Sequence, residues 1–269
     1  SVSYHDDFPV GSFGSPSCGK GLPGDLPHGT IQVITTDLKK AQDAANKLET
    51  HCGADGPESQ MSSMFHILTG NALTWSGGSV PKHTPPSGMW GGVDFRPGSV
   101  PVVILITDIN WHTEADYASS GITGGTIATM TDAFVKNNAR VVEITAGSET
   151  QADTLSDATK SAVPTGAFGT ACPAGQCPTN TSGGCRAATG PGGTCRLNFK
   201  HSGGTGVSGQ IVKAIQGIAV GSQYDVTAVP SNDPTNAVGD DGTVVDATKF
   251  IKALRAMDEG DSTVGCPAH

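Results

Sequence analysis

Two aspartates, Asp55 and Asp108, have the residue type and the position that suit the binding of a metal ion. Asp55 lies in a tight loop at 51–58, and Asp108 directly follows an apolar run at 100–107. Carboxylate oxygens are hard ligands, so the ion that they would bind is Mg²⁺ or Ca²⁺. If one coordination position stayed open, a carboxylate of a partner could complete the site. The alternative is that Asp55 caps a helix starting at Pro57 and that Asp108 is a solvated strand end.

A polar loop follows Asp108 and contains further candidates for the same site. Trp111, His112 and Glu114 could form its rim and contact the partner. A second possibility is a hydrolytic centre made of Asp108, His112 and Glu114. However, the chain has no Gly-x-Ser-x-Gly motif, no His-Glu-x-x-His motif and no convincing pair of nucleophile and base. We therefore expect a binding protein and not an enzyme.

Two other acidic positions are expected to be structural. Glu58 is predicted to lie in the first turn of a helix, where a negative charge is favourable. His5, Asp6 and Asp7 form a polar trio at the end of a short strand. Such a trio favours a surface turn over a contribution to the metal site.

The elements that must position these residues are those of an α/β protein. The run at 100–107 is apolar without a break, which is typical of a parallel strand covered on both faces. In open α/β sheets, ligands bind beyond the carboxyl ends of the strands, which is where Asp108 falls. Apolar periodicity predicts further strands at 1–4, 31–35, 139–145, 162–163 and 224–229, and helices at 38–49, 57–69, 123–136, 148–160, 207–219 and 249–257.

This alternation predicts a Rossmann-like, mostly parallel sheet flanked by helices, in a single domain over residues 1–269. Residues 71–99 and 109–117 are predicted to be loops. Residues 170–200 form an insertion that contains four of the seven cysteines. Their irregular spacing favours disulfides over a zinc site, although it does not reveal the pairing. The odd total leaves one cysteine free or paired outside the chain.

The composition limits the class of partner and the location. A formal net charge of −9 argues against binding to nucleic acid, which requires basic surfaces. No apolar run approaches the roughly 20 residues of a transmembrane helix, so we expect no transmembrane segment. The cysteine-rich insertion favours an oxidising location, which is extracellular, at the cell surface or periplasmic.

Three segments resemble the von Willebrand factor type A (vWA) domain, in the branch with a Gly-Gly-Gly-Asp-x-Pro-Glu loop. They are Cys52-Gly-Ala-Asp-Gly-Pro-Glu58, Val103-Ile-Leu-Ile-Thr-Asp108 and Asn138-Ala-Arg-Val-Val-Glu-Ile-Thr145. The resemblance implies a metal-ion-dependent adhesion site, with Asp55 on its second loop and Asp108 on its third. The first loop of that site, Asp-x-Ser-x-Ser, does not occur in the sequence. The first strand, helix and second strand of the family are therefore expected to be absent.

The resemblance implies a secreted or surface adhesion domain that recognises a protein or glycan with help from Mg²⁺ or Ca²⁺. The alternative is a structural subunit or processed fragment whose open sheet edge pairs with a second chain. Such a subunit would have no independent metal site, because the serine loop is missing.

Overall fold

A computed structural model of the protein describes residues 1–118, 120–178, 184–201, 205–221 and 248. The chain divides into two units, Ser1–Ser222 and Gln223–His269, and every element described below belongs to the first. The strand predicted at 224–229, the helix predicted at 249–257 and Cys266 lie outside the described residues. Whether residues 1–269 form one domain therefore stays a prediction, because almost all of the second unit lies outside the described residues.

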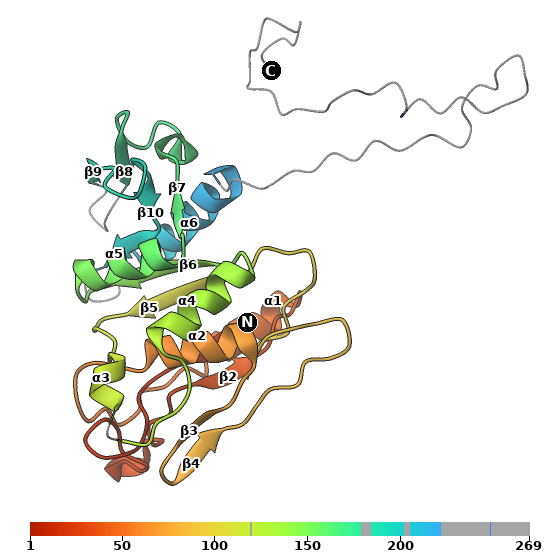
Figure 1. The fold of residues 1–269 in the computed structure, drawn as a ribbon, viewed down its shortest axis with the longest axis vertical. Coiled ribbons are helices and arrows are strands. Elements are labelled where there is room, and N and C mark those ends of the chain that lie inside the picture. The colour runs from red at the N-terminus through yellow and green to blue at the C-terminus, as the bar shows by residue number, and fades with distance from the viewer. Residues whose placement is uncertain (119, 179–183, 202–204, 222–247, 249–269) are drawn as a thin grey trace, which may run out of the picture. The chain divides into compact units, whose positions relative to one another are not determined.

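Three parallel strands form the central sheet in the order β11–β6–β5 (Figure 1). β5 (Val102–Thr107) and β6 (Arg140–Thr145) are the apolar runs predicted from the sequence, and they pair along their whole length. The third strand, β11 (Asn198–Lys200), pairs with β6 on its other side. It falls within 170–200, so the last residues of the predicted insertion belong to the central sheet.

Helices cover both faces of the sheet, as the unbroken apolar strands predict. On one face, Leu105 belongs to a buried cluster with residues of α2 (Gln60–Thr69) and α4 (Ile127–Lys136). On the other face, Ile144 belongs to a second cluster with residues of α6 (Val207–Gly221). The structure is thus a mixed α/β fold with a small parallel sheet between helices.

Most helix boundaries follow the signals in the sequence. The carboxylate of Asp37 accepts two backbone N–H bonds at the start of α1 (Leu38–Ala45). α2 ends at Gly70, which has the left-handed conformation that glycine adopts without steric cost. The Ser148 side chain caps α5 (Glu149–Ala158) by accepting a backbone bond from Gln151.

The start of α2 differs from the prediction, and the difference concerns the candidate site. The helix begins at Gln60, with Ser59 as its N-cap residue, and not near Pro57. Asp55 therefore does not cap this helix, and Glu58 does not lie in its first turn. Instead, Glu58 pairs with Trp111 in an isolated parallel bridge. Helix capping and the helix dipole therefore do not explain Asp55 and Glu58.

Short elements occupy two ranges that were predicted to be loops. Residues 71–99 contain an antiparallel hairpin of β3 (Leu73–Trp75) and β4 (Gly78–Val80). Residues 109–117 end in the one-turn helix α3 (Glu114–Tyr117). The remaining elements are the antiparallel pair β1 (Val2–Tyr4) and β2 (Gly29–Gln32), the pair β7 (Ala162–Val163) and β10 (Cys195–Arg196), the pair β8 (Gln176–Pro178) and β9 (Cys185–Ala187), and the 3₁₀ turns Gly19–Gly21 and Thr165–Phe168.

Six cysteines form disulfides, so the zinc alternative for the insertion is wrong. The pairs are Cys18–Cys52, Cys172–Cys185 and Cys177–Cys195. The last of these is buried in the cluster beneath α6. No helix among the described residues is long and apolar enough to cross a membrane.

Candidate functional site

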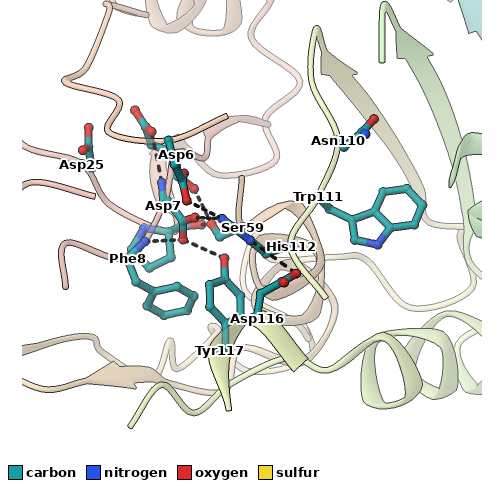
Figure 2. Close-up of polar contacts among 12 residues, drawn as sticks. Asp6, Asp7, Phe8, Asp25, Ser59, Asn110, Trp111, His112, Asp116 and Tyr117 are labelled. Atoms are coloured by element: carbon teal, nitrogen blue, oxygen red, sulfur yellow. Dashed lines mark hydrogen bonds and ion pairs between the residues drawn. The ribbon is translucent and has the colours of Figure 1, made fainter. Parts of the chain in front are cut away.

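Three segments that are far apart in the sequence meet beyond the carboxyl end of β5. The backbone N–H of Glu58 donates to the carbonyl of Asn110 (3.0 Å), and the N–H of His112 donates to the carbonyl of Glu58 (2.9 Å). The N–H of Ser59 in turn donates to the carbonyl of Asp6 (3.2 Å). Figure 2 shows the resulting group of side chains from the three segments. The loop of Asp55 and the loop after β5 are therefore neighbours.

The centre of the group consists of Asp7, Asp55 and His112. The Nε2 atom of His112 lies 3.1 Å from Oδ2 of Asp7 and 3.0 Å from Oδ2 of Asp55. The three atoms all lie within 4.8 Å of one another, so one metal ion could contact all of them. We call these three residues the His112 centre.

Asp7 is the buried member of the His112 centre, with 1% of its surface exposed. Its Oδ1 accepts bonds from the Phe8 N–H (2.6 Å) and the Tyr117 hydroxyl (2.7 Å). Its Oδ2 has no hydrogen-bond partner, even though His112 is close to it. Burial raises the pKa of Asp7 to about 7 despite those bonds. A buried carboxylate oxygen without a partner is costly, and a cation would remove that cost.

The second ring nitrogen of His112 faces another carboxylate. Its Nδ1 atom lies 3.5 Å from Oδ2 of Asp116. That carboxylate accepts bonds from the backbone and side chain of Thr113, which lower the pKa of Asp116. Metal-binding histidines commonly have a carboxylate on the nitrogen that does not bind the ion.

Aromatic rings enclose the imidazole. Phe13 and Tyr117 contact His112 with ring centroids 5.0 Å away, and Phe8 packs edge-on against Tyr117 at 5.3 Å. Burial and the nearby carboxylate of Asp7 both raise the pKa of Tyr117, so this hydroxyl stays a donor. The aromatic contacts limit access of water and strengthen electrostatic interactions at the His112 centre.

Glu58 and Asp6 form a carboxyl pair beside the His112 centre. Burial, together with the nearby charge of Asp6, raises the pKa of Glu58 to about 9. A hydrogen bond from Glu58 to Asp6 favours the arrangement in which Glu58 is protonated. Contrary to the prediction of a charged residue in the first turn of a helix, Glu58 is thus a partly buried acid outside the helix.

A second group of possible ligands, Asp6, Asp25 and His51, differs from the His112 centre in one respect. The carboxylate oxygens of Asp25 accept bonds from the N–H groups of Ser15 (2.7 Å) and Gly53 (3.0 Å). These bonds join the two loops that the Cys18–Cys52 disulfide also connects. Both carboxylate oxygens of Asp25 therefore have hydrogen-bond partners, and their role is to hold the two loops together.

The structure brings together some of the predicted site residues but not all of them. Asp55 and His112 are in contact within the His112 centre. Asp108 is exposed and belongs to neither group of possible ligands among the described residues, although its charge acts on the buried ring of His5. Glu114 is exposed at the start of α3.

The structure corrects two predictions for the loop after β5. Trp111 is only 5% exposed and lies in the core, so its indole is not part of the surface that a partner would meet. The carboxylates close to His112 are those of Asp7, Asp55 and Asp116, and not the Asp108 and Glu114 of the hydrolytic hypothesis.

Sequence reasoning missed Asp7. The polar trio at 5–7 predicts a surface turn, but Asp7 is among the most buried residues of the structure. The available signal was that two acidic residues end a strand immediately before the apolar Phe8. Local pattern alone does not show that the loop after β5 covers this turn.

No protein-family model matches this chain, and no curated protein matches it. The resemblance to vWA domains therefore remains a prediction that depends on the three segments quoted above.

Proposed function

We propose that the chain is an extracellular or cell-surface binding domain of the vWA type that recognises a protein or glycan with help from a divalent cation. The observation that carries the proposal is the His112 centre, in which two carboxylate oxygens and one imidazole nitrogen lie within 4.8 Å of one another. It occupies loops beyond the carboxyl end of a strand in a parallel sheet, where α/β proteins commonly bind ligands. The three disulfides support an oxidising location.

Burial within the His112 centre is uneven, which supports a role in recognition. The side chains of Asp7 and His112 are 1% and 7% exposed, whereas that of Asp55 is 27% exposed. An ion held by all three would therefore be reached from the side of Asp55. Three protein ligands leave at least one position for an oxygen of the partner, such as a carboxylate or a sugar hydroxyl.

A pocket of about 530 Å³ lies beside the Asp6–Asp25–His51 group and could contact the rest of the partner. Tyr4 and Trp75 line it together with several prolines. Aromatic side chains with a polar tip are common where proteins bind other proteins or glycans. The pocket thus supplies apolar area beside Asp25 and His51.

Removal of one ligand should abolish ion binding. For Asp55→Asn, we expect calorimetric titration with Mg²⁺, Ca²⁺ and Zn²⁺ to show no binding of the ion that the unchanged protein binds. An ion at 100 times its dissociation constant should stabilise the unchanged protein by about 2.7 kcal/mol, and the variant should lose this gain. Asp43→Asn is the control, because Asp43 is an exposed residue of α1 that pairs with Lys39. Absence of heat for every ion with the unchanged protein would contradict the role of a cation.

Partner recognition itself needs a separate experiment. Binding of the protein to immobilised glycans and extracellular proteins should weaken when EDTA is added, and Asp55→Asn should reproduce that loss. Binding that is unaffected by EDTA would remove the cation from the proposal. A complete lack of binding would remove recognition.

A second candidate function, as a subunit that pairs through its sheet, is favoured by the free edge of β5. In the parallel ladder, the carbonyls of Pro101 and Thr107 accept bonds from the β6 side. The backbone groups of Val102, Ile104 and Ile106 therefore point away from β6, and none has a backbone partner among the described residues. An apolar strand edge of this kind is a template for another strand.

A charge on this edge should prevent such pairing. Ile106 is 48% exposed, so Ile106→Lys should be tolerated by the fold while it reduces any concentration-dependent association seen in analytical ultracentrifugation. Val212→Lys is the matched control, because Val212 is an apolar residue of α6 with 54% exposure. A protein that stays monomeric at all concentrations would contradict self-pairing through β5. Equal loss of association in both variants would show that the edge is not specific.

A further inference from the structure

We infer that the His112 centre is a zinc site and that it discriminates against Mg²⁺ and Ca²⁺. This inference rests on the function proposed above, because it names the ion of the same site. The sequence predicts Mg²⁺ or Ca²⁺ because it offers the oxygen ligands Asp55 and Asp108; the zinc inference differs because the structure adds the nitrogen of His112.

The first argument is the set of donor atoms. The centre offers one imidazole nitrogen, from His112, and two carboxylate oxygens, from Asp7 and Asp55. Imidazole suits Zn²⁺ and its neighbours among the transition metals, whereas Ca²⁺ takes six to eight oxygen ligands and Mg²⁺ binds oxygens and water. Histidine nitrogen and carboxylate oxygen are both zinc ligands, and three protein ligands with an open fourth position match the coordination number of catalytic zinc sites.

The second argument is the spacing of these atoms and the lack of a hydrogen-bond partner for one of them. The Nε2 atom of His112 is 3.1 Å and 3.0 Å from the two carboxylate oxygens. Such separations approach those of neighbouring ligands around an ion with bonds of about 2.0–2.2 Å. The Oδ2 atom of Asp7, one of these three atoms, has no hydrogen-bond partner, and Asp7 is 1% exposed. This buried oxygen is explained if it is reserved for a ligand.

The third argument is that the surroundings hold each ligand in place. Oδ2 of Asp116 lies 3.5 Å from Nδ1 of His112, so its charge faces the ring nitrogen opposite the two aspartates, although Nδ1 makes no hydrogen bond among the described residues. The Tyr117 hydroxyl and the Phe8 N–H occupy the other oxygen of Asp7. Supporting partners of this kind fix the orientation of metal ligands, and their loss commonly weakens metal binding about 10–100-fold.

The experiment compares ions and variants of the full chain by isothermal titration calorimetry. We expect Zn²⁺ to bind at least about 100-fold more tightly than Mg²⁺ or Ca²⁺. His112→Ala should weaken Zn²⁺ binding by at least about 100-fold, and Asp116→Asn should weaken it about 10–100-fold. His51→Ala is the matched control, because His51 belongs to the other group of possible ligands. Circular dichroism of each variant shows whether the fold is retained.

A second readout reports the ligands of the bound ion. Co²⁺ in a site with a nitrogen ligand has visible absorption bands that respond to its ligands. These bands should appear with the unchanged protein and with His51→Ala, and they should be lost in His112→Ala. If His112→Ala does not fold, Asp116→Asn provides the test, because its residue lies on an exposed helix turn and does not itself contact the ion.

The outcomes separate this inference from the proposed function. Binding of Mg²⁺ or Ca²⁺ as tight as that of Zn²⁺, with no effect of His112→Ala, would overturn the zinc inference and leave a cation-assisted binding domain. Loss of Zn²⁺ binding in His51→Ala and not in His112→Ala would overturn it by placing the ion elsewhere. If no divalent ion binds, both proposals fail.

Discussion

The Glu143→Gln variant is expected to be more stable than the unchanged protein at pH 9 and to lose that advantage at pH 5. Glu143 lies in the middle of β6 and is only 3% exposed. One of its carboxylate oxygens is buried with no hydrogen-bond partner. Burial, together with the nearby charge of Asp153, raises its pKa to about 8.

The sign of the effect follows from where the proton binds. The raised pKa means that the folded state holds a proton that the unfolded state releases above about pH 4.5. Stability associated with Glu143 is therefore fully present below pH 4.5 and is lost as the pH rises through 8. At 1.36 kcal/mol for each unit, the free energy of unfolding should fall by about 4 kcal/mol between pH 5 and pH 9 through this residue. Glutamine cannot ionise, so the variant should not show this decrease.

Urea denaturation of both proteins at pH 5, 7 and 9 measures the difference. Glu149→Gln is the control, because Glu149 starts the neighbouring helix α5, and a hydrogen bond from Lys200 lowers its pKa. Its loss should matter more at high pH than at low pH, which is the opposite trend. A stability difference between Glu143→Gln and the unchanged protein that is constant with pH would contradict the prediction.

Elements with a local signal could be predicted from the sequence. β5 and β6 are apolar runs, and α5 and α6 lie within two residues of their predicted bounds. α1 begins at the predicted Leu38 but ends at Ala45, four residues before its predicted end. β11 could not be predicted in this way. It has only three residues, Asn198–Lys200, and its place in the sheet depends on pairing with β6, more than fifty residues earlier. Short strands in Cys- and Gly-rich segments carry little periodicity.

The candidate site was only partly predictable for a related reason. Asp55 and His112 could be named as acidic and polar residues in suitable loops, but the sequence did not show that they contact each other. The sequence favours a surface position for Asp7 because the two residues before it, His5 and Asp6, are polar. Its burial arises from the contact of Tyr117, which lies 110 residues away. Contacts of this kind depend on how the loops pack, and no local pattern encodes them.

For the disulfides, the sequence predicts that they form but not which cysteines pair. The crowded cysteines indicated disulfides, but four cysteines allow three pairings. The observed pairing places Cys177–Cys195 in the core and leaves Cys172–Cys185 partly exposed. The two bonds therefore differ in surroundings although they lie in one segment.

This difference predicts unequal effects of their removal. Cys177→Ala with Cys195→Ala should destabilise the protein by about 4–5 kcal/mol. The loop of 18 residues accounts for about 3 kcal/mol of loop-closure entropy, and the loss of two buried sulfurs accounts for the rest. Cys195 starts β10, which leads directly into β11. Its release should therefore loosen the third strand of the central sheet.

The matched variant, Cys172→Ala with Cys185→Ala, opens a loop of 13 residues, for which the entropic cost is also about 3 kcal/mol. Because chain entropy is nearly equal for the two bonds, the difference between the variants reports the contribution of burial. We expect the melting temperature to fall by about 10 °C or more for the buried bond and by several degrees less for the exposed one. Equal decreases would mean that the core beneath α6 tolerates the cavity. A larger decrease for Cys172–Cys185 would contradict the assignment of Cys177–Cys195 as the bond that anchors β10 and β11.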